Sequence, residues 1–264
     1  MHRVLAGVFG WLLLSAVAHA AAAPRSAPLE VRIAVAANFK QTLERMGEAF
    51  NAKHGGKLVV SAGATGQLYS QIVQGAPFDL FFSADRERAE RLEREGLAVA
   101  GTRFTYAVGR LVAWRPQRLW QGELASVLRS PEIDTVAIAN PQVAPYGAAA
   151  QQVLQALQGS TPWTFRLVQG ESLGQAYQFV ASGHAQLGFV SLSQIYESEA
   201  DADRPLRKEI VIVDPKLYAP LEQQAVLLRG GERSQLARDF LAFVRSPEGV
   251  SIIAAAGYDT PMPR

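Results

Sequence analysis

The sequence predicts an α/β fold of two lobes, each a mostly parallel sheet flanked by helices, with a hinge between the lobes. Three observations lead to this prediction. Short apolar runs alternate with segments of helical periodicity from Val31 onward, which is typical of strand–helix–strand units. The alternation occurs in two separate series. Two further apolar runs fall where the chain would pass from one lobe to the other.

The N-terminal residues have the three parts of a secretory signal peptide. Arg3 supplies a short positive region, residues 4–17 are almost entirely apolar, and an A-x-A cleavage pattern ends at Ala20. We therefore expect cleavage near Ala20, with residues 1–20 outside the fold and the mature protein in the periplasm.

The composition excludes several classes of function. The chain of 264 residues has no cysteine and a formal net charge of +2, so a secreted form must hold together by its core alone. Its lysines and arginines form no cluster, which argues against a nucleic-acid partner. Only His54 and His184 lie beyond the signal segment, and two histidines without cysteine cannot build a zinc site. We expect no cofactor.

The first series of elements runs from residue 31 to residue 95. A strand at Val31–Val35 is followed by a helix whose apolar face is formed by residues 39, 43, 46 and 50. Asn38, with a glutamine three residues later, is the expected start of this helix, and Gly55 its expected end. Further strands and helices are expected in turn at residues 58–61, 67–73, 79–83 and 86–95.

The second series runs from residue 135 to residue 195. The expected strands and helices alternate at residues 135–139, 146–157, 165–168, 175–181 and 188–190. Strands at 110–114 and 225–228 fit neither series, and final helices at 233–244 and 250–256 would return to the first lobe. We therefore expect a discontinuous first lobe, residues 29–106 and 223–264, and an inserted second lobe, residues 107–222.

Ligands of open α/β sheets bind beyond the carboxyl ends of the strands, where helices begin. Four such junctions are rich in small residues, two in each expected lobe, and they centre on Asn38, Thr65, Tyr146 and Leu173. A helix N-terminus presents free N–H groups and about half a positive charge. Four of them would match a dianion, with added donors from the Asn38 amide and the Thr65 and Tyr146 hydroxyls. As an alternative, Asn38 and Thr65 would serve only as N-caps.

Five stretches resemble the periplasmic molybdate-binding proteins of ABC transporters. They are VAANF at 35–39, AGATG at 62–66, GAPFDLFFSAD at 75–85, NPQVAPYG at 140–147 and LGFV at 187–190. The resemblance extends from Val31 to Tyr258. It implies the type II periplasmic binding protein fold and a monomer that captures molybdate or tungstate for the ABC transporter permease in the inner membrane.

The resemblance also implies which residues contact the oxyanion. Carried over position by position, the contacts fall on Asn38, Thr65, Tyr146 and Leu173, the last through its backbone N–H. Thr65 replaces the more usual serine. Two secondary candidates remain. Ala37 stands where relatives carry a hydroxyl residue, and Ser191 stands where one branch of the family places a tyrosine, a role that Tyr146 would take as in the other branch.

A hydrolase is the alternative from a different class. The stretch GESLG at 170–174 matches the G-x-S-x-G pattern around Ser172. That fold requires an acid and then a histidine after the serine, but only His184 follows, with no acidic residue between the two. Ser172 with Gln175 also forms a capping box, which explains the serine without catalysis.

Other anions are the alternatives within the same class. A receptor for sulfate or a small organic acid remains open. Phosphate is disfavoured, because monohydrogen phosphate carries a proton that requires an acceptor, and the junctions offer mainly donors. Asp79 and Asp85 would repel a dianion, so both are expected to be structural, with Asp85 as the N-cap of the helix at 86–95.

Overall fold

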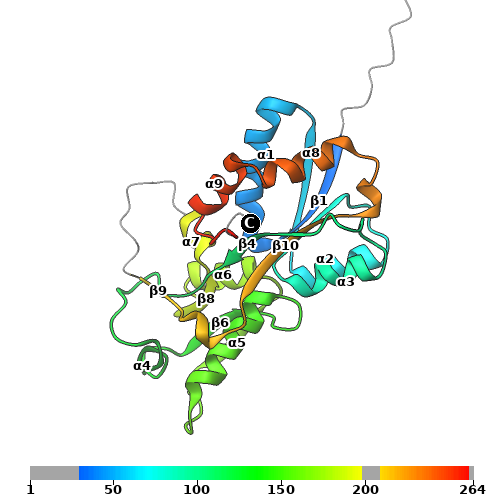
Figure 1. Ribbon diagram of the computed structural model, residues 1–264. Helices are drawn as coiled ribbons and strands as arrows, with labels where there is room; N and C mark the ends of the chain where they lie inside the picture. Colours follow the sequence, from blue (N-terminus) through cyan, green and yellow to red (C-terminus); the bar gives the residue numbers. More distant parts are fainter. Residues whose placement is uncertain (1–29, 198–208, 262–264) are drawn as a thin grey trace, which may run out of the picture.

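The computed structural model describes residues 30–197 and 209–261 (Figure 1), so the expected signal segment, residues 1–20, lies outside the described residues. Within them the strands form two five-stranded sheets. The first sheet has the order β2-β1-β3-β10-β4, with β1 (Glu30–Ala36), β2 (Lys57–Gly63), β3 (Leu80–Ser83), β4 (Phe104–Gly109) and β10 (Leu221–Leu227). The second has the order β7-β6-β8-β5-β9, with β5 (Leu111–Trp114), β6 (Thr135–Ala139), β7 (Arg166–Gly170), β8 (Leu187–Ser191) and β9 (Ile210–Ile212).

Helices flank both sheets (Figure 1). Around the first sheet lie the 3-10 turn η1 (Ala37–Phe39), α1 (Lys40–His54), α2 (Thr65–Val73), α3 (Arg86–Arg94), α8 (Gln235–Val244) and α9 (Pro247–Ala255). The second sheet is accompanied by α4 (Leu124–Leu128), α5 (Pro145–Gln158), α6 (Leu173–Ala181) and α7 (Leu192–Glu197), and short turns η2 (Pro215–Leu217) and η3 (Arg229–Gly231) flank β10. No helix in the described ranges has the length and apolar character needed to cross a membrane.

The two sheets share one arrangement. In each, three neighbouring strands are parallel, the fourth is antiparallel to them, and the fifth is antiparallel to the fourth. Four of five strands therefore run in one direction, and the reversed strand is β10 in the first sheet and β5 in the second. The chain passes from β4 directly into β5, and from β9 through η2 into β10. Each reversed strand is thus the one that the chain enters after leaving the other sheet.

The core of the first lobe confirms the predicted apolar helix face. Residues 39, 43, 46 and 50 are all buried and pack with Phe240 of α8 in one cluster. The ring centroids of Phe50 and Phe240 lie 5.2 Å apart, with an edge-to-face angle of 77°, a geometry that adds to the stabilisation from burial. Helices α2 and α3 cover the opposite face through Leu68, Ile72 and Leu92.

Most predicted helix ends are found, with one correction. Gly55 is the C-cap of α1 at φ +67°, a conformation that favours glycine. Asp85 caps α3, because its carboxylate accepts the backbone N–H of Arg88 at 2.9 Å. The expectation that Asn38 starts its helix by capping it is wrong. Asn38 lies inside η1 and its side chain makes no cap bond.

Candidate functional site

The four predicted junctions lie in two adjacent pairs. Strands β1 and β2 are parallel and in register up to Ala36 and Gly63, so the turns after them are neighbours. Strands β6 and β7 are likewise in register up to Ala139 and Gly170. Each sheet therefore brings two helix N-termini to one edge, as expected at the carboxyl ends of parallel strands.

All four junctions line one small cavity. Its volume is about 10 Å³, the size of roughly one water-sized sphere. No charged side chain is among its described lining residues, which are Ala36, Ala37, Asn38, Gly63, Ala64, Thr65, Ala84, Ala144, Pro145, Tyr146 and Leu173. The structure thus brings together all four predicted contact residues and the secondary candidate Ala37.

A larger cavity lies elsewhere and has different chemistry. It has a volume of about 180 Å³ and lies between the loop at Arg115–Arg118 and the loop before β8. Both of its arginines, Arg115 and Arg118, pair with the single carboxylate of Glu132, which offsets one of their two positive charges and would oppose a dianion. The small cavity is the better candidate, because its donors have no such counter-charge.

Alanine occupies the N-cap position at three of the four junctions. Ala36, Ala64 and Ala144 precede η1, α2 and α5, and none of them makes a side-chain cap bond. Away from the cavity, α8 and α9 begin with Ser234 and Ser246, whose hydroxyls accept first-turn N–H groups. Because alanine is a poor cap, the first turns at the cavity have N–H groups without a side-chain acceptor of their own. Such N-termini attract anions.

Thr65 is the first residue of α2 and is almost fully buried. Its hydroxyl oxygen accepts the backbone N–H of Ala84 at 3.3 Å. Because the oxygen accepts this bond, the hydroxyl proton remains to be donated. Thr65 therefore does not cap its helix, and it presents a neutral donor at the cavity wall.

Tyr146 presents a second hydroxyl from the opposite lobe. It lies in the first turn of α5, it is buried, and its oxygen accepts Nε2 of Gln223 at 3.2 Å. Burial raises the pKa of Tyr146 well above its ordinary value, with further increases from Tyr258 and Tyr106. The hydroxyl is therefore neutral and protonated at every physiological pH, which suits a hydrogen-bond donor.

Asn38 is placed differently from the sequence expectation. Its side-chain amide turns away from the helix and donates to Oε1 of Gln223 at 2.9 Å and to the hydroxyl of Tyr258 at 3.0 Å. Its backbone carbonyl accepts the hydroxyls of Tyr258, at 2.7 Å, and Ser193, at 3.1 Å. The side-chain amide is thus committed to a buried network, and the backbone N–H in η1 is the donor that suits a ligand.

Leu173 opens α6, and Ser172 before it is the N-cap. The Ser172 hydroxyl accepts the N–H of Gln175 at 3.3 Å, and the Gln175 side chain accepts the N–H of Glu171 at 2.6 Å. The serine half of the predicted capping box is confirmed, whereas Gln175 bonds the residue before the N-cap rather than the N-cap itself. The Leu173 N–H takes part in neither bond. His184, the histidine that a hydrolase would need, contacts Ser182 instead.

Ser191 lies one step away from the cavity. Its hydroxyl contacts that of Ser193 at 2.9 Å and accepts the N–H of Gln194 at 3.2 Å, at the start of α7. Ser193 in turn reaches the Asn38 carbonyl. Ser191 is therefore found in a supporting position behind the cavity wall.

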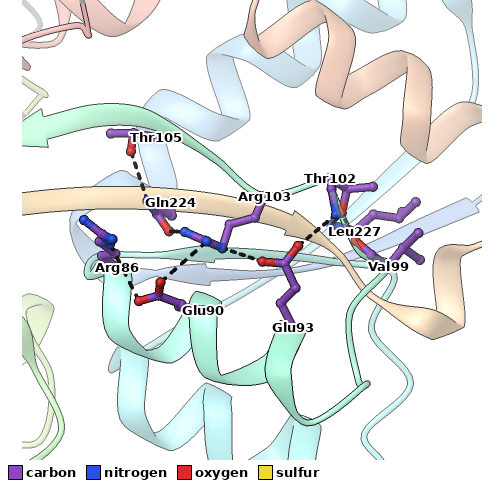
Figure 2. A network of polar contacts seen from close by, with 10 residues as sticks. Arg86, Glu90, Glu93, Val99, Thr102, Arg103, Thr105, Gln224 and Leu227 are labelled. Atoms are coloured by element: carbon purple, nitrogen blue, oxygen red, sulfur yellow. Dashed lines mark hydrogen bonds and ion pairs between the residues drawn. The ribbon is translucent and has the colours of Figure 1, made fainter.

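Sequence reasoning missed the residues that hold the site from behind, Gln223 above all. Gln223 lies on β10, is fully buried, and contacts side chains from both lobes. Its neighbour Gln224 faces the other side of the strand, where it accepts from Arg103 at 2.8 Å and donates to Thr105 at 3.0 Å (Figure 2). Two adjacent glutamines in the buried part of a strand, after Glu222 and before the apolar residues 225–227, were the signal that could have marked this place.

Arg103 joins α3 to the sheet next to the site. Its guanidinium also pairs with Glu93 at 2.8 Å and with Glu90 at 3.6 Å, and Figure 2 shows the whole network between α3 and β10. The Arg103 hydrogen bond lowers the pKa of Glu93 below its ordinary value. The network ties α3 to β10 on the side of the strand away from Gln223.

Metal chemistry has no support in the same region. Within the described residues no group of histidine, aspartate and glutamate side chains could hold a metal ion. The cavity instead offers hydroxyl and amide donors, which suit the oxygens of an anion.

Known proteins that are similar to this chain are solute-binding proteins. The family described as bacterial extracellular solute-binding protein matches residues 31–259. The molybdate-binding protein ModA of Azotobacter vinelandii is 42% identical over 87% of this chain and 89% of its own length, and ModA of Rhodobacter capsulatus is 42% identical over 88% of each. A solved structure, the periplasmic molybdate-binding protein of Azotobacter vinelandii, is similar with a TM-score of 0.78 and 37% identity, covering 88% of this chain and 100% of that one.

Proposed function

The chain belongs to the family of bacterial extracellular solute-binding proteins, and we propose that it captures molybdate and delivers it to an ABC transporter. Its relatives named above are binding proteins, and two of them are named for molybdate at 42% identity. The protein is therefore a receptor and not an enzyme. Its function is to bind a solute and release it unchanged.

One observation carries the proposal: four helix N-termini from two sheets meet at one buried, uncharged cavity. Each N-terminus contributes about half a positive charge, so together they offset roughly the two charges of molybdate. Hydrogen bonds to a charged acceptor contribute about 1.5–3 kcal/mol each. The Thr65 and Tyr146 hydroxyls and the backbone N–H groups of Asn38 and Leu173 are the proposed donors, and Ala37 forms part of the wall.

Movement of the lobes makes room for the ligand. A tetrahedral oxyanion is larger than a cavity of about 10 Å³, so the lobes must open to admit the ion, and the lining side chains must adjust around it when the lobes close again. The chain crosses between the sheets at residues 109–111 and 213–220, and these segments are the proposed hinges. The lobe boundaries expected from the sequence, residues 29–106 with 223–264 and residues 107–222, lie within a few residues of these crossings.

The donor set selects for charge and protonation state. Molybdate and tungstate are both fully ionised tetrahedral dianions, so the site should accept both. Monohydrogen phosphate would bring a donor of its own against the two donating hydroxyls. That mismatch leaves one buried polar group without a partner, at a cost of about 1–3 kcal/mol.

The remaining assignments follow from the family. Delivery requires a permease in the inner membrane as the partner, and we propose that the mature protein acts in the periplasm as a monomer after cleavage near Ala20. The first 20 residues lie outside the described part of the chain.

Calorimetric titration of the mature chain tests the proposal. Molybdate and tungstate should each bind at one ion per chain, with sulfate weaker and phosphate weaker still. Phosphate binding as tight as molybdate binding, or no heat with any of the four anions, would refute the proposed function.

A further inference from the structure

Gln223 joins the two halves of the candidate site. It lies on β10 at the point where the pairing with β4 is irregular, with Gln223 opposite Ala107 and Gln224 opposite Thr105. The side chain is fully buried and bonds Asn38, Tyr106 and Tyr146. Bulges of this kind re-aim side chains next to functional sites.

The hydrogen bonds fix which end of the Gln223 amide faces which partner. The Tyr258 hydroxyl donates its one proton to the Asn38 carbonyl at 2.7 Å, so the Tyr258 oxygen must accept from the Asn38 amide. Nδ2 of Asn38 is therefore the atom that also reaches Gln223, which must accept it through Oε1. The Tyr106 hydroxyl donates to the same oxygen at 3.0 Å.

With Oε1 occupied by two donors, Nε2 of Gln223 faces Tyr146 and donates to its hydroxyl oxygen at 3.2 Å. The Tyr146 proton cannot point back at an N–H donor, so it points elsewhere on the oxygen. Gly109 makes this contact sterically possible, because a Cβ at that position would lie 2.0 Å from the Tyr146 oxygen and 2.8 Å from Nε2 of Gln223.

Thr65 has the same arrangement on the other lobe. The backbone N–H of Ala84 donates to the Thr65 oxygen, as the side chain of Gln223 donates to the Tyr146 oxygen. The oxygens of both hydroxyls thus accept a hydrogen bond from the protein, so each hydroxyl has its proton left to donate to a ligand. Of these two protein donors, only Gln223, which donates to Tyr146, is a side chain that a substitution can change.

We propose that Gln223 is a specificity-determining positioning residue, which sets the direction of the Tyr146 hydroxyl proton and so restricts the site to oxyanions that carry no proton. This inference rests on the function proposed above. Gln223 is not among the residues that line the cavity, and it belongs to none of the four junctions. It acts on the ligand through Tyr146 and Asn38.

Substitution of Gln223 by glutamate tests the inference. An ionised carboxylate would accept a hydrogen bond from the Tyr146 hydroxyl and so turn its proton away from the ligand. The Tyr146 oxygen would then face the ligand as an acceptor. Molybdate affinity should fall by at least about tenfold at neutral pH, and the ratio of molybdate to phosphate affinity should narrow. The charge-matched control is Gln224→Glu on the opposite face of the strand, beside Arg103 (Figure 2), which should bind as the wild type does.

The pH profile separates orientation from mere structural support. Burial raises the pKa of an introduced carboxyl, and once protonated it again donates to Tyr146, so Gln223→Glu should regain molybdate affinity as the pH falls. The titratable groups facing Gln223 and its partners are Tyr106, Tyr146 and Tyr258, with Asp85 acting on Tyr106. Burial raises the pKa of both Tyr106 and Tyr146, so the wild type should show no such recovery.

A second variant covers a failure of the first to fold. Gln223→Met keeps the size and removes both polar ends, so it should weaken molybdate binding by about tenfold without any dependence on pH. Wild-type affinity and selectivity in both variants would overturn the inference, as would equal, pH-independent losses in Gln223→Glu and Gln223→Met. Equal losses of molybdate affinity in Gln223→Glu and Gln224→Glu would also overturn the inference. Failure of the wild type to bind molybdate would overturn both the proposed function and the inference.

Discussion

The backbone N–H of Gly66 donates to the carbonyl oxygen of Val143 over 2.8 Å. This bond links the first turn of α2, beside the first sheet, to the loop that precedes α5, beside the second. Arg88 adds a contact to the adjacent carbonyl of Gln142 at 3.3 Å. The two lobes therefore meet through main-chain groups next to the proposed Thr65 donor.

Gly66→Ala should weaken oxyanion binding without destabilising the protein. An added Cβ would lie 3.0 Å from Cα and 3.1 Å from the carbonyl oxygen of Val143, while alanine itself favours the helix. Overpacking costs about 1–3 kcal/mol, so affinity should fall roughly five- to a hundredfold. Gly174→Ala is the matched control, because its Cβ meets nothing closer than 3.6 Å. Equal affinities of the two variants in calorimetry would contradict this explanation of closure.

Thr65→Ala removes a proposed donor to the ligand. Loss of a charge-assisted hydrogen bond costs about 1.5–3 kcal/mol, so molybdate affinity should fall about ten- to a hundredfold. Thr65→Ser keeps the hydroxyl and should bind within a few-fold of the wild type. If alanine at this position bound as tightly as serine, Thr65 would contribute only to packing.

Tyr146→Phe should reduce both affinity and stability. It removes a donor at the cavity and leaves Nε2 of Gln223 buried without its acceptor, which costs about 1–3 kcal/mol in the free energy of unfolding. Tyr69→Phe is the control, because that hydroxyl donates to Glu95 at 2.9 Å and lines no part of the cavity. Urea unfolding and calorimetry on both variants measure the two effects, and loss of affinity in Tyr69→Phe would count against the assignment.

Stability should fall in alkaline solution while binding stays constant near neutrality. Burial raises the pKa of Tyr106 and Tyr146 well above the ordinary 10.0. Below that value both the folded and unfolded forms are protonated. As the pH rises past it, the unfolded chain loses protons that the folded protein keeps, so the free energy of unfolding decreases. Tyr146→Phe should lessen this decrease in urea titrations, and an unchanged slope would show that Tyr146 does not contribute to it.

Ser172→Ala should cost stability and nothing else. Loss of an N-cap hydroxyl costs about 0.5–2 kcal/mol, and Ser234→Ala at the start of α8 should cost a similar amount, since both serines accept an N–H three residues on. Neither the wild type nor the variant should hydrolyse a nitrophenyl ester. Esterase activity that disappears with Ser172 would revive the hydrolase alternative.

Local patterns in the sequence were sufficient for much of the fold and the outline of the site. Three features depend on residues within a few turns of one another: the apolar face from Phe39 to Phe50 and the N-caps at Asp85 and Ser172. They were predicted from spacing and are found in the structure. The four junctions meet because parallel strands end at the same edge of a sheet, which also follows from topology.

The supporting network depends on contacts that no local pattern encodes. Asn38 is separated from Gln223 by 185 residues and from Tyr258 by 220, and its predicted capping role gave way to these two partners. A buried amide gains more from two or three hydrogen bonds in the core than from one at an exposed helix start. Strands were expected at residues 110–114 and 225–228, where β5 and β10 are found, but their reversed direction was out of reach, because their neighbours in the sheet come from distant parts of the chain.

A crystal structure of the mature protein with molybdate tests the central claim most directly. The account predicts the ion between the two lobes, with its oxygens accepting from the hydroxyls of Thr65 and Tyr146 and from the backbone N–H groups of Asn38 and Leu173, and with no charged side chain in contact. An ion held by arginine or lysine, or bound to one lobe alone, would contradict it.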